Sequence, residues 1–225
     1  MINFFFILFK INKHNSIIAN HYDIISNSFD NSRVRIWNNV KLFLNDYNSI
    51  NNNLLDVGCG NGKNMIYAET LGYKCTGYDI STNLLNVCRN KNLNVYYYDV
   101  LNNKSITKYD KIICIAVLHH LETCESQIIA INNMLSQLNS NGELLISFWS
   151  KEKYFNINEN MKNKNDYRNF EVGPNYVDWK LSKDNIIKRF YYIHDHNSIV
   201  KLADSINCDY KLSWELQNWF ILFKK

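Results

Sequence analysis

Glycine and proline are scarce in this sequence, with seven glycines and one proline among 225 residues. Asparagine, lysine, isoleucine and tyrosine are abundant instead, and we attribute this bias to an AT-rich genome rather than to function. Hydrophobic residues make up 46% and charged residues 20%, which is ordinary for a globular protein and excludes a largely disordered chain. The length fits one domain with a full hydrophobic core.

Long apolar runs and paired cysteines are also missing. The apolar N-terminus, residues 1–10, is far shorter than the roughly 20 residues that span a bilayer, and it lacks the basic start and cleavage site of a signal peptide. We expect it to form a short strand or helix that packs on the domain, without a membrane. The six cysteines form no C-x-x-C pair, so we predict no metal site and expect the reduced thiols of a cytoplasmic protein.

A strong charge of either sign is absent, because the net charge is only +4. Most of the excess lies in residues 151–189, which hold nine basic and six acidic side chains. Such an excess permits an anionic partner such as RNA without requiring one, and a solvated surface is the simpler interpretation.

Apolar runs and amphipathic stretches alternate from residue 20 onward. The pattern predicts helices over 20–46, 63–71, 82–90, 123–138 and 197–207. It predicts strands over 53–58, 74–78, 95–99, 111–117, 143–149, 210–214 and 218–223. Strands that alternate with helices across short connections favour a mostly parallel sheet with helices on both faces.

The C-terminal hairpin adds an antiparallel strand to this α/β sheet. That arrangement is typical of the Rossmann-like class I methyltransferase fold, with seven strands, and not of nicotinamide-binding domains. We interpret the chain as a single domain, 1–225. Its predicted parts are an N-terminal helical region at 1–50, a cofactor-binding core at 51–150, an insertion at 151–188, and a C-terminal helix and hairpin at 189–225.

The strongest local motif is LLDVGCGNGK at 54–63, where a strand runs through a glycine-rich turn into a helix. Gly58, Gly60 and Gly62 permit positive φ and let the backbone approach a ligand closely. Asp79 ends the next strand, 21 positions after Gly58, where an acidic side chain accepts hydrogen bonds from ribose hydroxyls. Its alternative role is the N-cap of the following helix.

Nicotinamide cofactors and adenosylmethionine both bind to this geometry, and three further features distinguish between them. Asp99 closes the third strand, where a carboxylate meets the adenine amino group. Asp56 is costly inside a strand unless partnered, and suits a ligand with an ammonium and a sulfonium group. Nicotinamide sites favour a further glycine later in the turn, and none follows Gly62 there. The sequence therefore predicts S-adenosyl-L-methionine, bound by Asp56, Gly58, Gly60, Asn61, Gly62, Asp79, Ile80, Asp99, Val100 and Ala116.

LDVGCGNGK at 55–63 and IAVLHHL at 115–121 together resemble the eukaryotic wobble-uridine tRNA methyltransferases. The landmarks between His21 and Trp37, RFYYIH at 189–194 and NWF at 218–220 are similar to that family too. The resemblance runs from about residue 20 to the C-terminus, apart from the insertion. It implies esterification of a carboxymethyl group on C5 of the wobble uridine in tRNA, and activation by a small zinc-ribbon protein that adds a strand to the sheet.

A carboxylate acceptor is already ionised at pH 7, so no strong base is needed and alignment carries the catalysis. We expect Arg33, together with one of Arg189, Tyr191 or His194, to clamp that carboxylate. We expect His119 to shape the pocket and to hydrogen-bond the acceptor, the alternative being a capping or packing role.

Two other functions fit the same motifs. In the first, the enzyme methylates a small acid or metabolite, because the fold does not determine the acceptor. In the second, the chain is a partner protein that keeps the fold but has no catalytic activity. Among the tryptophans, Trp179 is the better candidate for stacking on an unpaired base, whereas Trp37 and Trp149 are interpreted as core residues.

Overall fold

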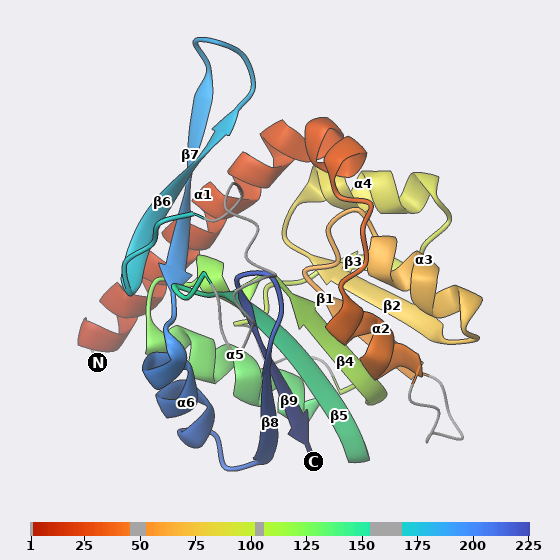
Figure 1. The fold of residues 1–225 in the computed structure, drawn as a ribbon. Coiled ribbons are helices and arrows are strands. Elements are labelled where there is room, and N and C mark those ends of the chain that lie inside the picture. Colours follow the sequence, from red (N-terminus) through yellow and green to blue (C-terminus); the bar gives the residue numbers. More distant parts are fainter. Residues whose placement is uncertain (1, 46–52, 102–105, 154–167) are drawn as a thin grey trace, which may run out of the picture.

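The computed structural model describes residues 2–45, 53–101, 106–153 and 168–225, with side chains from residue 13 onward. A seven-stranded sheet, in the order β3-β2-β1-β4-β5-β9-β8, lies between helices (Figure 1). Its strands are β1 (Asn53–Val57), β2 (Lys74–Asp79), β3 (Val95–Tyr97), β4 (Tyr109–Ile115), β5 (Leu138–Trp149), β8 (Asp209–Trp214) and β9 (Asn218–Lys224). The helices are α1 (Ile2–Ser32), α2 (Asn38–Asn45), α3 (Lys63–Thr70), α4 (Thr82–Asn90), α5 (Cys124–Ser136), α6 (His196–Asp204) and the short 3₁₀ turn η1 (Leu118–His120).

Strand pairing confirms the predicted mostly parallel sheet with an antiparallel C-terminal strand. Strands β3, β2, β1, β4 and β5 pair in parallel, and β9 lies antiparallel between β5 and β8. Because parallel neighbours end at the same edge, the turns after β1 to β5 gather along one side of the sheet.

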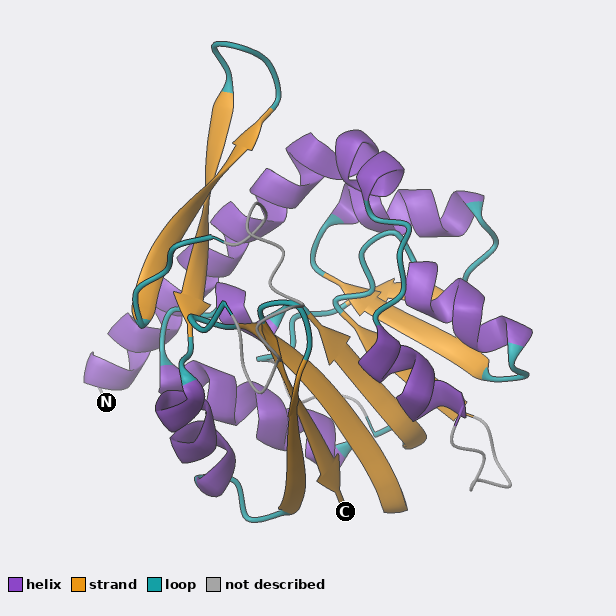
Figure 2. Cartoon of the chain, viewed as in Figure 1, coloured by secondary structure: helices purple, strands orange, loops and turns teal. Residues whose placement is uncertain are grey.

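Helices cover both faces of the sheet (Figure 2). Alternation of side chains along the strands therefore divides the core into two layers. Ile112 and Cys114 of β4 face α5 and α6, whose buried side chains include Met134 and Ile199. Ile113, on the other face, packs in the cluster that holds the buried side chains of α2, α3 and α4. Both faces are therefore covered, which explains the continuous apolar run that predicted a buried strand.

The N-terminal region differs from the single helix predicted over 20–46. Helix α1 extends from Ile2 to Ser32, and α2 begins at Asn38 after an irregular segment at 33–37. The apolar residues 2–10 belong to α1, and their side chains lie outside the described part. In Figure 1, α1 crosses the domain above the sheet and passes beside the β-hairpin.

The insertion contains a hairpin that the sequence pattern did not predict. Strands β6 (Gly173–Lys180) and β7 (Ile186–Ile193) form a separate antiparallel pair that projects from the domain in Figure 1. Strand β7 runs across the boundary that we placed between residues 188 and 189, so Arg189 belongs to the hairpin. Residues 154–167 lie outside the described residues.

Candidate functional site

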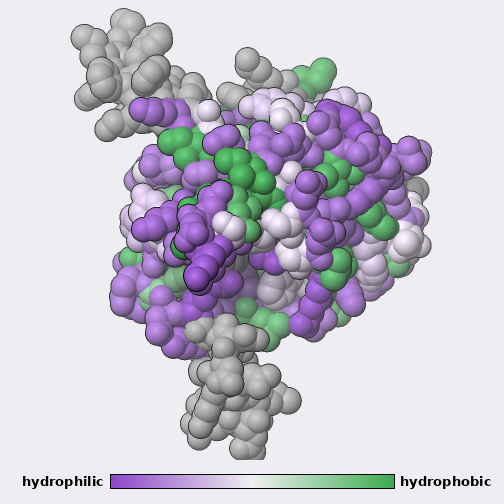
Figure 3. Space-filling view, turned by 90° about the horizontal axis from the view of Figure 1, so that it is seen from above, coloured by the Kyte–Doolittle hydropathy of each residue, from purple (hydrophilic) through white to green (hydrophobic). Residues whose placement is uncertain are grey.

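One cavity of about 650 Å³ opens at the carboxyl ends of the parallel strands. The turns after β1, β2, β3 and β4 line one part of it, and α1, β5 and β7 line the rest. Figure 3 views the molecule from this side, where hydrophobic residues gather near the centre of a mostly hydrophilic face. Clefts at this edge of an open α/β sheet are where such folds bind ligands.

The glycine turn packs so tightly that residues with a side chain do not fit at Gly58 and Gly60 without a shift of their neighbours. Gly58 has φ +70°, and a Cβ there would lie 2.2 Å from Cγ2 of Val117. Gly60 has φ +56° and would place a Cβ 3.2 Å from the ring of Phe29 on α1. Both glycines line the cavity, together with Asn61, so the backbone itself forms this wall.

Two carboxylates lie at this end of the cavity. Oδ2 of Asp79 accepts a hydrogen bond from the Gly60 amide at 2.9 Å, and Oδ1 accepts one from Ser81 at 2.8 Å. Burial raises the pKa of Asp79. Asp99 accepts a hydrogen bond of 2.7 Å from Asn15, which ties α1 to the end of the third strand. The remaining predicted cofactor residues that line this end are Ile80, Val100 and Ala116.

Asp56 and Gly62 do not line the cavity, contrary to the prediction. Asp56 shares the strand face of Leu54, which is covered by α2, α3 and α4, and is fully buried with no hydrogen bond to either oxygen among the described residues. Burial and then the charge of Asp79 raise the pKa of Asp56 to about 7. Gly62 precedes α3, and a Cβ there would lie 2.2 Å from Leu93, so its role is packing.

The opposite part of the cavity is basic. Arg189 is 4% exposed and lines the cavity, yet no acidic side chain pairs with it within the described residues, and its Nε has no hydrogen-bond partner there. Arg33 also lines the cavity, with its guanidinium 5.2 Å from the ring centroid of Trp179, and Arg168 adds further positive charge, with its guanidinium 4.4 Å from the ring centroid of Trp149. A buried cation without an anion is expensive, so this end is suited to an anionic ligand.

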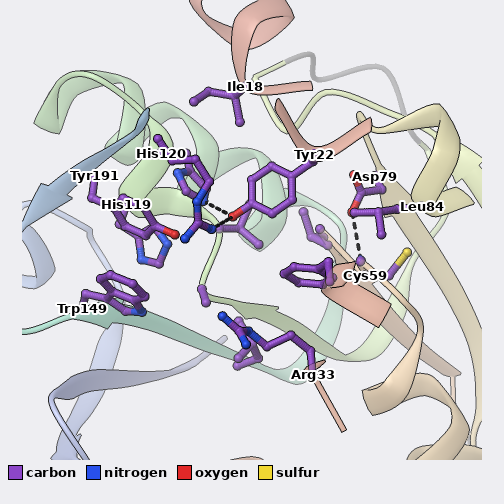
Figure 4. A pocket seen from close by; sticks show the side chains of 18 of the residues that line it. Ile18, Tyr22, Arg33, Cys59, Asp79, Leu84, His119, His120, Trp149 and Tyr191 are labelled. Atoms are coloured by element: carbon purple, nitrogen blue, oxygen red, sulfur yellow. Dashed lines mark hydrogen bonds between the residues drawn. The ribbon is translucent and has the colours of Figure 1, made fainter. Parts of the chain in front are cut away.

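Aromatic rings form the wall beside Arg189, and the labelled side chains of this wall face Asp79 across the pocket in Figure 4. Tyr191 stacks on Trp149 at 4.2 Å between ring centroids and lies 4.6 Å from His119. Burial, together with the positive charge of Arg189, lowers the pKa of His119 well below its usual value, so this ring is neutral at pH 7. Its Nδ1 is buried without a hydrogen-bond partner in the described structure.

His194, one of the three alternatives for the second residue of the clamp, does not line the cavity, whereas Arg189 and Tyr191 do. Its Nε2 lies 2.9 Å from Oε1 of Gln127, and its Nδ1 lies 3.3 Å from the hydroxyl of Ser198. The spacing explains this, because side chains alternate along a strand and His194 is three positions after Tyr191. The structure therefore brings Arg33, Arg189, Tyr191 and His119 together and leaves His194 in the core.

Trp179 is not free to stack on a base. The guanidinium of Arg189 lies 4.7 Å from its ring centroid, that of Arg33 lies 5.2 Å away, and its Nε1 donates a hydrogen bond to Ser28. Trp149, which we interpreted as a core residue, lines the cavity instead. Sequence reasoning missed the residues that α1 and the insertion contribute, namely Asn15, Ile18, Tyr22, Phe29, Arg168 and Phe170.

The described residues also bear on two other types of site. No group of three or more His, Cys, Asp or Glu side chains suited to a metal ion occurs there. None of the helices in that part of the chain combines the length and the hydropathy that a membrane crossing requires.

The profile of a family described as a methyltransferase domain matches residues 30–184, which is more than half of the chain. The chain belongs to this family. Over 148 residues it is 33% identical to the tRNA (carboxymethyluridine(34)-5-O)-methyltransferase alkbh8 of Xenopus tropicalis, a match that covers 65% of this chain and 22% of that protein. Over 133 residues it is 35% identical to the tRNA (carboxymethyluridine(34)-5-O)-methyltransferase of Arabidopsis thaliana, which covers 59% of this chain and 32% of that protein. The chain thus spans a third or less of the length of these relatives.

Solved structures confirm the methyltransferase fold. The DhpI-SAM-HEP complex superimposes with a TM-score of 0.68 at 12% identity, and the match covers 92% of this chain and 95% of that one. The family match confirms the predicted methyltransferase domain, and the shared fold confirms its Rossmann-like class I architecture. The geometry of the cavity bears on which molecule accepts the methyl group.

Proposed function

We propose that this methyltransferase esterifies the carboxymethyl group of the wobble uridine in tRNA anticodons. The observation that carries the proposal is the position of Arg189, a buried cation without an acidic partner in the described residues, at the end of the cavity away from Asp79 and Asp99. A carboxylate of the acceptor supplies the missing anion and gains paired hydrogen bonds from a planar guanidinium.

The other end of the cavity fits S-adenosylmethionine. Gly58 and Gly60 leave backbone without side chains at the wall, and Asp79 offers carboxylate oxygens for ribose hydroxyls. Asp99 lines the same cavity, which supports its proposed contact with the amino group of adenine. When bound, S-adenosylmethionine supplies a methyl group activated by a positively charged sulfur.

The chain itself has little proton chemistry to perform. The acceptor oxygen is already anionic at pH 7, and formation of the new carbon–oxygen bond releases no proton, so no general base is needed. Arg33 and Arg189 orient the carboxylate, and the rings of Trp149 and Tyr191 exclude water. His119 is neutral, so it offers a hydrogen bond to the acceptor without adding charge.

The tRNA substrate and the activator rest on similarity. Relatives from Xenopus tropicalis and Arabidopsis thaliana are named as carboxymethyluridine tRNA methyltransferases, and the basic residues that line the cavity suit an anionic substrate. The zinc-ribbon activator stays a prediction. It needs an unpaired sheet edge, and β3 and β8 are the outer strands of this sheet.

Methyl transfer from labelled S-adenosylmethionine to tRNA that carries carboxymethyluridine tests the proposal, with and without a zinc-ribbon protein. We expect base-labile label confined to that tRNA. Label in small carboxylic acids but not in tRNA would favour a metabolite acceptor. Adenosylmethionine binding without transfer to either acceptor would favour an inactive partner protein.

A further inference from the structure

A chain of hydrogen bonds connects Arg189 to the turn that follows β4. Nη1 of Arg189 lies 3.2 Å from the hydroxyl of Tyr22, which lies 2.8 Å from Nε2 of His120. Nδ1 of His120 lies 2.7 Å from the backbone oxygen of Phe190. Figure 4 shows the hydroxyl of Tyr22 directed toward His120. This series of hydrogen bonds therefore starts at the side chain of Arg189 and returns to the backbone of the next residue on β7.

The three groups give this chain a single direction. A carbonyl oxygen only accepts, so Nδ1 of His120 carries the proton and donates to Phe190. Burial lowers the pKa of His120 to about 3, so the ring is neutral at pH 7 and its Nε2 accepts. Tyr22 then donates to Nε2, and its oxygen accepts from Arg189. Because His120 takes the hydroxyl proton of Tyr22 as a hydrogen-bond acceptor, the tyrosine oxygen is left to accept from the guanidinium of Arg189.

His120 also joins three elements at this point. Nε2 of His14 on α1 lies 2.8 Å from the backbone oxygen of His120. Tyr22 comes from the same helix, His120 from η1, and Arg189 and Phe190 from β7. The long helix that crosses the cavity and the hairpin are therefore tied to the edge of the sheet where the acceptor end lies.

We propose that Tyr22 and His120 are positioning residues, which hold the guanidinium of Arg189 so that its other N–H groups face the acceptor carboxylate. This inference rests on the proposed function. Ring contacts alone leave the guanidinium free to turn in its plane, since they lie 4.7 Å away at Trp179 and 5.3 Å away at Tyr191. A hydrogen bond from Nη1 removes that freedom.

Tyr22→Phe removes one oxygen and keeps the ring, so it separates the hydrogen bond from packing. With an anticodon stem-loop that carries carboxymethyluridine, we expect its Kd to rise about tenfold, the range of a hydrogen bond to a charged group. We expect the Kd of S-adenosylmethionine and kcat to change less than twofold, and the KM of the acceptor to rise with its Kd. Tyr176→Phe, at a position on β6 that is 69% exposed, is the matched control and should leave every value unchanged.

Two replacements of His120 divide its roles. His120→Gln keeps an acceptor near the place of Nε2, and His120→Asn keeps a donor near the place of Nδ1. We expect Tyr22→Phe to cost about tenfold in acceptor affinity when added to His120→Gln, and less than twofold when added to His120→Asn. This non-additivity is what a shared path predicts and what independent structural roles do not produce.

The two proposals fail in different ways. If the wild-type protein binds stem-loops with carboxymethyluridine and carbamoylmethyluridine equally well, the proposed carboxylate acceptor is wrong. If it prefers the carboxylate and Tyr22→Phe keeps wild-type affinity and KM, or costs the same in both His120 variants, the positioning role is wrong.

Discussion

Gly58→Ala tests whether the turn after β1 binds the cofactor through backbone that leaves no room for a side chain. Alanine at φ +70° costs about 1–2 kcal/mol, because the left-handed region brings Cβ against the following carbonyl. The new methyl group would also lie 2.2 Å from Val117, and overpacking of this kind costs about 1–3 kcal/mol. We therefore expect a loss of roughly 2–5 kcal/mol in the free energy of unfolding, and a Kd for S-adenosylmethionine that rises more than tenfold.

Gly72→Ala is the matched control. Gly72 has φ +88°, but nothing lies within 4 Å of its would-be Cβ, so only the backbone cost of about 1–2 kcal/mol applies. Urea titration measures stability and calorimetry measures cofactor affinity for both variants. Adding Val117→Ala should recover part of the stability lost in Gly58→Ala, because all three short contacts there are with the side chain of Val117. Equal stability of the two glycine variants, or wild-type cofactor affinity in Gly58→Ala, would refute the reasoning.

Three further predictions concern single side chains. Asp79→Asn should raise the Kd of S-adenosylmethionine about 10- to 100-fold, measured by calorimetry, because one charged acceptor is lost; an unchanged Kd would remove Asp79 from the cofactor site. His120→Asn should flatten the pH dependence of stability. The pKa of His120 in the folded protein, about 3, lies below its value in the unfolded protein, so wild-type protein loses stability as pH falls from about 6.5 toward 3. The urea midpoint of the wild-type protein should therefore fall toward that of the variant over this range. Arg189→Met should weaken acceptor binding about 100-fold in fluorescence titrations, whereas Lys188→Met, at the neighbouring exposed position, should not.

Local signals in the sequence were sufficient for the core of the fold. The residues of α4 were predicted without error, because Ser81 caps the helix and the apolar spacing continues to Asn90. Strand β1 and the glycine turn follow from neighbouring residues in the same way, whereas β3 and β4 end at Tyr97 and Ile115, two positions before their predicted ends.

The rest of the site depends on contacts between distant residues. Strand β6 has an exposed or half-exposed side chain at every position after Gly173, so it lacks the apolar alternation that predicts a strand. Tyr22 lies 167 residues before Arg189, and no local pattern reports that they meet. The motif that includes His194 does not show which face of a strand its side chain occupies, so its position away from the cavity could not be predicted.

In the proposed function, the acceptor is a carboxylate held by Arg189. The most direct test compares the affinity of the protein for anticodon stem-loops that carry carboxymethyluridine or its neutral carbamoylmethyl analogue. We predict that wild-type protein prefers the carboxylate at least tenfold and that Arg189→Met removes this preference without changing adenosylmethionine binding. Equal affinity of the wild-type protein for both stem-loops, or a preference that survives in Arg189→Met, would contradict the account.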